Sequence, residues 1–232
     1  DRLIEQGNEV AGCDNLIGGY MENVPEDSEF YQVDAIYLNQ MKKMTKNVDL
    51  IIHTACTAYE GLSVFSPYLI GQNTYQISMS VFTAAASNNI SNVINCSSMA
   101  RYGEQRVVPF TEDLTPKPQD PYGIAKLASE QTLDVLSSVH GFNYVNLVPH
   151  NIIGPRQKFD DPYRNVVSIM INRILNGKPP IIYGDGTQER CFSDIDDVVD
   201  PIIRSINNKN AVGETINIGP DEDVITIKDL AF

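Results

Sequence analysis

Short apolar runs alternate with longer stretches of helical periodicity over the first two thirds of the chain. The runs at residues 48–56, 93–98 and 144–149 are almost continuously apolar, as expected of parallel strands buried on both faces. Residues 68–88 and 122–140 favour helices, and Gly141 supplies a stop for the second of them. This alternation predicts an α/β fold built on a parallel sheet.

The start of the chain follows the same order. Residues 1–8 indicate the last turns of a helix that stops at Gly7, and residues 9–14 and 29–34 indicate two short strands that each end in an acid. A dinucleotide-binding fold has one more strand and a glycine-rich turn before this helix. The sequence starts too late to contain either, and residues 226–232 indicate a helix that is only beginning. We therefore expect a fragment, or a chain with further residues at its ends.

The remaining segments indicate a smaller second unit. A helix is expected over residues 165–177, and its first turn offers free backbone amides to a phosphate. The sequence Gly184-Asp185-Gly186 is typical of a hairpin turn. We divide the chain into a first domain at 1–150 and a second at 151–232.

Composition narrows the function classes. With 42% apolar residues the chain can bury a core, and a formal charge of −13 makes nucleic acid an improbable partner. An anionic ligand would need local cations, for which the candidates are Arg101, Lys126, Arg156 and Arg190. The four cysteines are scattered and the three histidines do not cluster with them, so we expect no metal and no disulfide framework. Free thiols fit a reducing cytoplasm, and neither a membrane span nor a signal peptide is visible.

One pair of residues suggests catalysis. Tyr122 and Lys126 are four residues apart and share one helix face. An ammonium beside a phenol favours the phenolate, so Lys126 is expected to lower the pKa of Tyr122 and make it a base for a sugar hydroxyl. Because the chain has 11 tyrosines, the spacing alone is weak evidence, and a tyrosine at a helix start is also a common packing residue. A serine hydroxyl at the carboxyl end of the preceding strand, where Ser97 and Ser98 lie, could complete a Ser, Tyr, Lys triad.

The motifs together resemble the extended short-chain dehydrogenases/reductases that act on nucleotide sugars, the group that includes UDP-galactose 4-epimerase. Four segments carry the resemblance, namely residues 95–103 (NCSSMARYG), 121–126 (PYGIAK), 149–157 (PHNIIGPRQ) and 180–190 (PIIYGDGTQER). It implies a Rossmann-like doubly wound parallel sheet with a smaller C-terminal substrate domain, and NAD as cofactor. It also implies the possibility of a homodimer formed through the helix that carries Tyr122 and the long helix before Ser98.

The resemblance also implies roles for individual residues. Ser98, Tyr122 and Lys126 would be catalytic. The cofactor would be bound by Asp14 at the ribose, Asp34 at the adenine amino group, Ala55, Asn73 and Pro149, together with Tyr122 and Lys126. The nucleotide sugar would be bound by Asn151, Asn165, Val166, Tyr183 and Arg190. The alternative interpretation of Asp14 is a solvated turn residue without a binding role. The chain departs from the family at Pro149 and His150, where an aromatic residue is common.

The reaction is inferred by elimination within the family. Dehydratases carry Thr-Asp-Glu where this chain has Ser98, Met99 and Ala100, and decarboxylating relatives place Glu, and GDP-mannose 3,5-epimerases Cys, at the position of Ala100. What remains is epimerisation at C4 of a UDP-hexose of the UDP-glucose/UDP-galactose type, through a 4-keto intermediate. Two alternatives stay open: another nucleotide-sugar oxidoreductase (a C4 reductase or dehydratase) and a non-catalytic nucleotide-binding module. The sequence does not distinguish the sugar or its N-acetylation.

Overall fold

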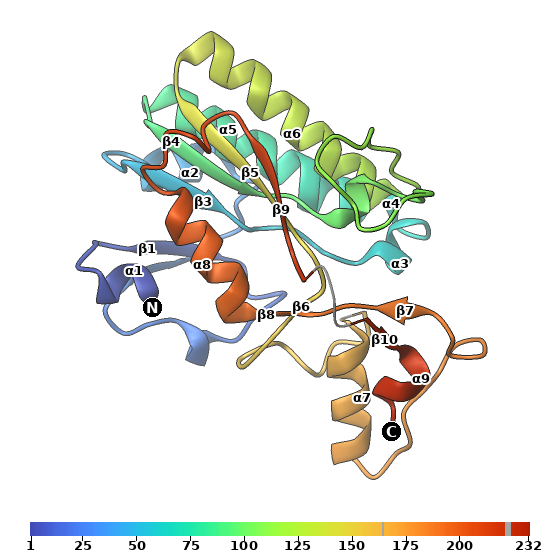
Figure 1. Ribbon diagram of the computed structural model, residues 1–232. Coiled ribbons are helices and arrows are strands. Elements are labelled where there is room, and N and C mark those ends of the chain that lie inside the picture. Colours follow the sequence, from blue (N-terminus) through green and yellow to red (C-terminus); the bar gives the residue numbers. More distant parts are fainter. Residues whose placement is uncertain (164, 221–223) are drawn as a thin grey trace.

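A parallel sheet with helices on both faces forms the larger part of the molecule (Figure 1). The computed structural model describes residues 1–163, 165–220 and 224–232. Four parallel strands pair in the order β3-β4-β5-β9, and β1 pairs in parallel with β2 beside them. The strands are β1 (Ala11–Asp14), β2 (Glu29–Gln32), β3 (Leu50–His53), β4 (Asn92–Cys96), β5 (Asn143–Pro149) and β9 (Thr215–Ile218).

Helices cover both faces of this sheet. Helices α2 (Leu38–Met44), α5 (Ile77–Ser87) and α6 (Pro121–His140) pack on one face, in a core that includes Phe82, Val93 and Leu133. Helix α8 (Ile195–Ser205) packs on the other face, where Val198 contacts a core that includes Val145 and Leu147. This arrangement confirms the predicted doubly wound α/β class.

The long helix predicted at residues 68–88 is divided. It consists of α4 (Pro67–Gly71), a π-helical turn at Gln72–Gln76, and α5. A further short helix, α3 (Glu60–Ser63), precedes α4. Single π-helical turns within α-helices are frequent at functional sites, and this one carries Asn73.

The second lobe lies below the sheet in Figure 1. It contains a parallel pair, β6 (Ile152–Ile153) with β8 (Ser193–Asp194), an antiparallel pair, β7 (Glu189–Arg190) with β10 (Ile225–Thr226), and the helices α7 (Val166–Leu175) and α9 (Ile227–Leu230). The short elements α1 (Arg2–Glu5) and the 3₁₀ turns Met21–Asn23 and Met99–Arg101 complete the described structure.

The sheet does not end where the sequence suggested. Residues 144–149 were expected to form its last strand, but β9 pairs with β5 from Asn146↔Thr215 to Pro149↔Ile218. Both α8 and β9 belong to the stretch assigned to the second domain, and both return to the larger unit. A single cut at residue 150 therefore does not follow the sheet, because the chain crosses between the lobes more than once.

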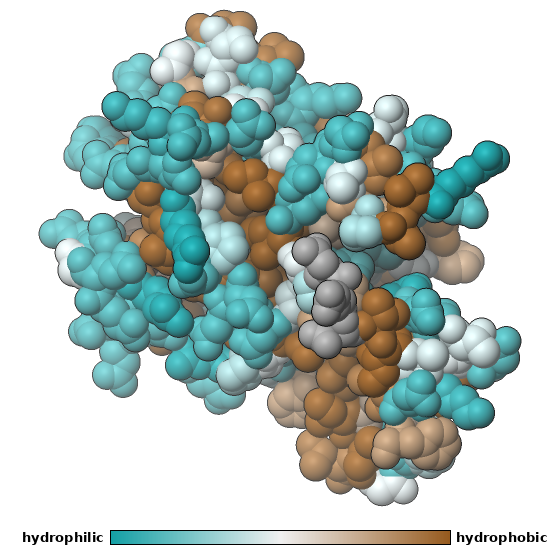
Figure 2. Space-filling model, in the orientation of Figure 1, coloured by the Kyte–Doolittle hydropathy of each residue, from teal (hydrophilic) through white to brown (hydrophobic). Residues whose placement is uncertain are grey.

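Apolar side chains remain on the surface of the second lobe. Figure 2 shows them over α7, where Ile171, Ile174 and Leu175 are exposed. Within residues 1–163, 165–220 and 224–232, no helix has the length and apolarity needed to cross a membrane. The four cysteines are free thiols.

Gly123 allows α6 to approach the turn that follows β4. A Cβ at this position would lie 2.5 Å from the carbonyl oxygen of Ala100. We predict that Gly123→Ala lowers the free energy of unfolding by about 1–3 kcal/mol, because backbone must move to relieve the contact. Chemical denaturation measures this change.

The matched control is Gly71→Ala in α4, where a Cβ would meet no heavy atom within 4 Å. Alanine in a helix is favoured over glycine by roughly 0.5–1 kcal/mol, so this variant should be slightly more stable than the parent. Equal losses in both variants would contradict the close approach of α6.

Candidate active site

The carboxyl ends of β1, β2 and β3 open into one cavity of about 230 Å³. Four of the five residues predicted to contact only the cofactor line it, namely Asp14, Asp34, Ala55 and Asn73. Parallel strands place their carboxyl ends at one edge of a sheet, which is the usual ligand-binding edge of open α/β folds. The fifth residue, Pro149, ends β5 and pairs with Ile218.

The two acids are held by local hydrogen bonds. Asp14 accepts one from the backbone N–H of Leu16 at 2.6 Å. Asp34 accepts one from the side chain of Asn15 at 3.0 Å and one from the N–H of Ile36 at 2.9 Å. Asn73 donates to the hydroxyl of Thr57 at 3.0 Å. These bonds fix the orientation of the polar side chains that face the cavity.

Ser98, Tyr122 and Lys126 come together next to this cavity. Tyr122 and Lys126 are buried on α6, and Ser98 begins the turn after β4. The hydroxyl of Ser98 lies close enough to the phenol of Tyr122 to lower its pKa. The ammonium of Lys126 lies 5.9 Å from the centroid of the Tyr122 ring. Sequence reasoning therefore selected three residues that the fold places as one group.

Helix α6 starts where it does because of Asp120. Its carboxylate accepts hydrogen bonds from the backbone N–H groups of Tyr122 and Gly123, both at 2.9 Å. An aspartate cap followed by a proline in the first turn is a strong helix start. Tyr122 consequently lies in the first turn, directly against the turn that carries Ser98.

The predicted tuning of Tyr122 by Lys126 is wrong for this structure. Burial raises the pKa of Tyr122 well above its ordinary value, and Cys56 adds to the rise, while the nearby hydroxyl of Ser98 lowers the pKa. Lys126 donates its hydrogen bond to the backbone carbonyl of Cys96 at 2.7 Å. Desolvation of the phenol therefore outweighs the attraction of the nearby cation.

The charge of Lys126 does affect the pKa of His53, the last residue of β3. Burial and, to a smaller extent, the charge of Lys126 together lower the pKa of His53 to about 3. The Nε2 atom of His53 lies 3.0 Å from the hydroxyl of Ser78 on α5. His53 is thus a neutral, hydrogen-bonded core residue.

Two of the four candidate cations are committed to other partners. Arg101 is buried, and its Nε donates to Glu130 at 2.9 Å. Arg156 pairs with Asp1 at 2.6 Å on the surface. The prediction that Arg101 is available to an anionic ligand is therefore wrong.

The residues predicted to bind the substrate are dispersed over the second lobe. Asn151, with a positive φ of 35°, lies beside His150, and its side-chain amide donates to the carbonyl of Cys191 at 3.1 Å. Asn165 caps α7 by accepting from the N–H of Ser168 at 3.1 Å, and Val166 is the first residue of that helix. The side chain of Asn165 is therefore already engaged in capping.

Arg190 lies close enough to His150 to lower its pKa, which burial lowers more strongly. It is exposed on β7 and donates to the carbonyl of Glu189. Tyr183 is 79% exposed in the loop before β7. Arg190 and Asn151 thus both lie near His150, whereas the side chain of Tyr183 faces solvent.

Sequence reasoning missed two residues near Tyr122. The Sγ of Cys56 lies 4.0 Å from the phenol oxygen and also lines the cofactor cavity. Glu60 begins α3, and its pKa is raised by burial and by Asp120 and lowered by Arg190. The charge of Glu60 in turn raises the pKa of Tyr122. Neither residue belongs to a recognisable motif, so only spatial proximity reveals them.

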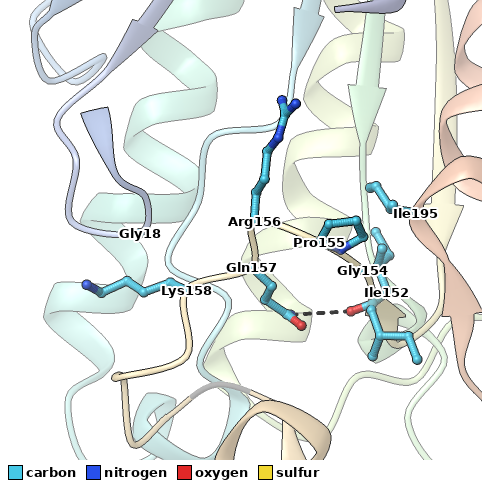
Figure 3. A pocket seen from close by; sticks show the side chains of 9 residues that line it. Gly18, Ile152, Gly154, Pro155, Arg156, Gln157, Lys158 and Ile195 are labelled. Carbon is cyan, nitrogen blue, oxygen red and sulfur yellow. Dashed lines mark hydrogen bonds between the residues drawn. The ribbon is translucent and has the colours of Figure 1, made fainter. Parts of the chain in front are cut away.

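A second cavity of about 260 Å³ adjoins the first, and Gly18 lines both. Its other walls come from the segment 152–158 and from Ile195 on α8. Figure 3 shows Arg156, Gln157 and Lys158 leaving this segment in different directions, with the amide of Gln157 donating to the carbonyl of Ile152 at 3.4 Å. Among the described residues, no group of three or more His, Cys, Asp or Glu side chains is placed to hold a metal ion.

Comparison with known proteins decides the family. The pattern of the NAD dependent epimerase/dehydratase family matches residues 1–219. The chain belongs to this family. This membership confirms the resemblance seen in the sequence motifs, the Rossmann-like fold and NAD as the cofactor.

Three relatives indicate the range of the family around this member. A putative UDP-glucose 4-epimerase of Methanocaldococcus jannaschii is 31% identical, and the alignment covers 96% of this chain and 72% of that protein. The UDP-glucose 4-epimerase of Thermotoga maritima, solved with UDP-glucose, gives a TM-score of 0.93 at 29% identity over 99% of this chain and 74% of the other. The UDP-N-acetylglucosamine 4-epimerase of Methanobrevibacter ruminantium, in complex with UDP-N-acetylmuramic acid, gives 0.90 at 34% identity over the same shares.

The cavity residues fit part of a NAD molecule. The volume of the cavity, about 230 Å³, is below the roughly 300–1,000 Å³ of typical ligand pockets. The cavity would therefore take one portion of the dinucleotide. Two carboxylates at the strand ends suit the hydroxyl groups of a ribose and the amino group of an adenine. In this family member, Asp14 and Asp34 are accordingly the residues that would hold the adenosine end.

We predict that Asp14→Asn weakens NAD binding about 10-fold or more, because a hydrogen bond from a hydroxyl to a carboxylate contributes roughly 1.5–3 kcal/mol. Titration calorimetry with NAD measures the effect. Asp27→Asn, an exposed acid in the loop before β2, is the control and should bind as the parent does. Unchanged affinity of the Asp14→Asn variant for NAD would show that Asp14 does not bind the cofactor.

We also predict a pH dependence of stability that originates at His53. The folded state keeps His53 neutral with a pKa of about 3, whereas the unfolded chain binds a proton near pH 6.5. Stability is therefore lost as the pH falls below about 6.5, and the loss from pH 7 to pH 5 should be about 2 kcal/mol. His53→Gln should abolish this part of the slope in denaturation curves, whereas replacement of the exposed His140 by Gln should preserve it.

Proposed function

We propose that this chain belongs to an NAD-dependent 4-epimerase of a UDP-hexose. The observation that carries the proposal is the position of the Ser98 turn directly against the first turn of α6, which brings the Ser98 hydroxyl near the Tyr122 phenol, with Lys126 in the next turn of the same helix. These three groups suffice to move one proton to and from a sugar hydroxyl. The residues after Ser98 are Met99 and Ala100, so the turn carries no acid for eliminating water.

The chemistry assigned to the chain is proton transfer. Tyr122 takes the proton of the C4 hydroxyl and later returns it, and Ser98 polarises the same oxygen with its hydrogen bond. When bound, NAD would supply the hydride acceptor and donor needed to oxidise C4 and reduce it again. Lys126 anchors this part of α6 to the end of β4 by donating to the carbonyl of Cys96. Burial, which raises the pKa of Tyr122 in the absence of ligands, excludes water from the transfer.

Asp14, Asp34, Ala55, Asn73 and Pro149 are proposed as cofactor contacts. Asn151, Asn165, Val166, Tyr183 and Arg190 are proposed as substrate contacts. Support is strongest for Arg190, because a guanidinium matches a diphosphate in two parallel hydrogen bonds, and weakest for Asn165, whose side chain already caps α7. The named relatives with UDP-sugar activities support uridine as the nucleotide.

The test is product analysis with UDP-galactose and, separately, UDP-N-acetylgalactosamine, without added reductant. We expect the corresponding gluco epimer. Tyr122→Phe should lower turnover about 10²–10⁴-fold, the range contributed by a positioned acid–base group. Tyr144→Phe is the control, since Tyr144 is also a buried tyrosine but bonds Asp134 on the far part of α6, and it should retain turnover.

Other products would identify the rival activities. Net consumption of NADH would indicate a C4 reductase. A released 4-keto sugar would indicate a dehydratase, in which Glu60 is the acid near Tyr122 that would supply the proton. Nucleotide binding without turnover of either sugar would indicate a non-catalytic module.

A further inference from the structure

Three buried polar side chains lie behind the proposed catalytic residues and take no part in the proposed reaction. They are Ser97, Arg101 and Glu130, each less than 8% exposed. One oxygen of the Glu130 carboxylate accepts a hydrogen bond from the hydroxyl of Ser97, and the other accepts one from Nε of Arg101 at 2.9 Å. A single carboxylate therefore joins two points of the segment after β4.

These two points enclose Ser98. Ser97 precedes it directly, and Arg101 ends the 3₁₀ turn Met99–Arg101 that Ser98 caps. Glu130 lies on α6 four residues after Lys126 and eight after Tyr122, so all three project from one side of the helix. The carboxylate thus fixes both ends of the segment that carries Ser98 to the helix that carries Tyr122.

We propose that Glu130 is a positioning residue that holds the turn with Ser98 against Tyr122. The inference rests on the proposed function only in taking Ser98 and Tyr122 as the reacting pair. The clamp formed by Ser97, Arg101 and Glu130 is a property of the folded chain and is testable without substrate.

The energetics favour positioning over a purely stabilising role. Burying an ion pair costs desolvation that the attraction between the charges often fails to exceed, and apolar residues of similar size can replace such pairs without loss of stability. The Arg101–Glu130 pair is also incompletely satisfied, since Nη1 of Arg101 is buried without a hydrogen-bond partner in the described structure. What the pair supplies is a fixed geometry for the turn.

The first experiment is amide hydrogen exchange of the ligand-free chain. Three backbone N–H groups report on the turn: that of Ala100 donates to the Ser98 hydroxyl, that of Arg101 to the Ser98 carbonyl, and that of Tyr102 to the Met99 carbonyl. Glu130→Gln should speed exchange at these amides about tenfold or more, because two charge-assisted bonds are lost or weakened. Exchange elsewhere on α6 and β5 should change little.

Asp134→Asn is the matched control. Asp134 lies one turn further along α6, and its carboxylate accepts a hydrogen bond from Tyr144 on β5 at 2.9 Å. The substitution makes the same chemical change on the same helix, and exchange at residues 100–102 should stay as in the parent. If Glu130→Gln does not fold, Ser97→Ala serves instead, since it removes one bond of the clamp and leaves the ion pair intact.

The second experiment is a double-mutant cycle on turnover. Glu130→Gln should lower kcat about 10- to 100-fold at unchanged KM, because a displaced Ser98 impairs the reacting hydroxyl rather than nucleotide binding. In a Ser98→Ala background the same substitution should have no further effect on kcat. A merely structural role for Glu130 would lower kcat equally in both backgrounds.

The outcomes separate the two proposals. Unchanged exchange at residues 100–102 in Glu130→Gln, or in Ser97→Ala if Glu130→Gln does not fold, would overturn the clamp. Effects of Glu130→Gln and Ser98→Ala on kcat that multiply in the double variant would overturn it as well. Faster exchange in a chain that epimerises no UDP-hexose would retain the clamp and reject the proposed function.

Discussion

The docking of the first turns of α6 against the carboxyl end of β4 is the constraint on which the site depends. Gly123 lets the helix backbone approach the carbonyl of Ala100 closely, and Lys126 bonds the carbonyl of Cys96. Asp120 sets the first residue of the helix by capping it. Because β4 is an interior strand of the parallel sheet, the phenol of Tyr122 is positioned against the core of the fold.

The same docking explains why a helical tyrosine and a loop serine act as a pair. Buried ion pairs rarely add net stability, but they specify one arrangement where several apolar packings would compete. Glu130 sits where such specification matters, between the turn with Ser98 and the helix with Tyr122. The proposed reaction then needs little motion within the larger unit.

Local signals accounted for much of this architecture before the structure was considered. Apolar runs marked β3, β4 and β5, Pro121 with good helix formers marked α6, and Gly141, with φ 77°, ended it as expected. Long-range pairing left no such signal. The four residues of β9 pair with a strand some 70 residues earlier, and the partners of Arg101 and Lys126 depend on side-chain packing that spacing does not encode. The pKa of Tyr122 was misjudged for the same reason, because desolvation is set by the whole surrounding core.

The central claim is that Tyr122 and Ser98 serve a reaction in which the hydrogen removed from C4 returns to C4. Turnover of UDP-galactose carrying deuterium at C4, with the product analysed by mass spectrometry and NMR, tests it most directly. The account predicts UDP-glucose that retains deuterium at C4 in ordinary water. Product that has exchanged this deuterium with solvent, or that carries it at another carbon, would contradict it.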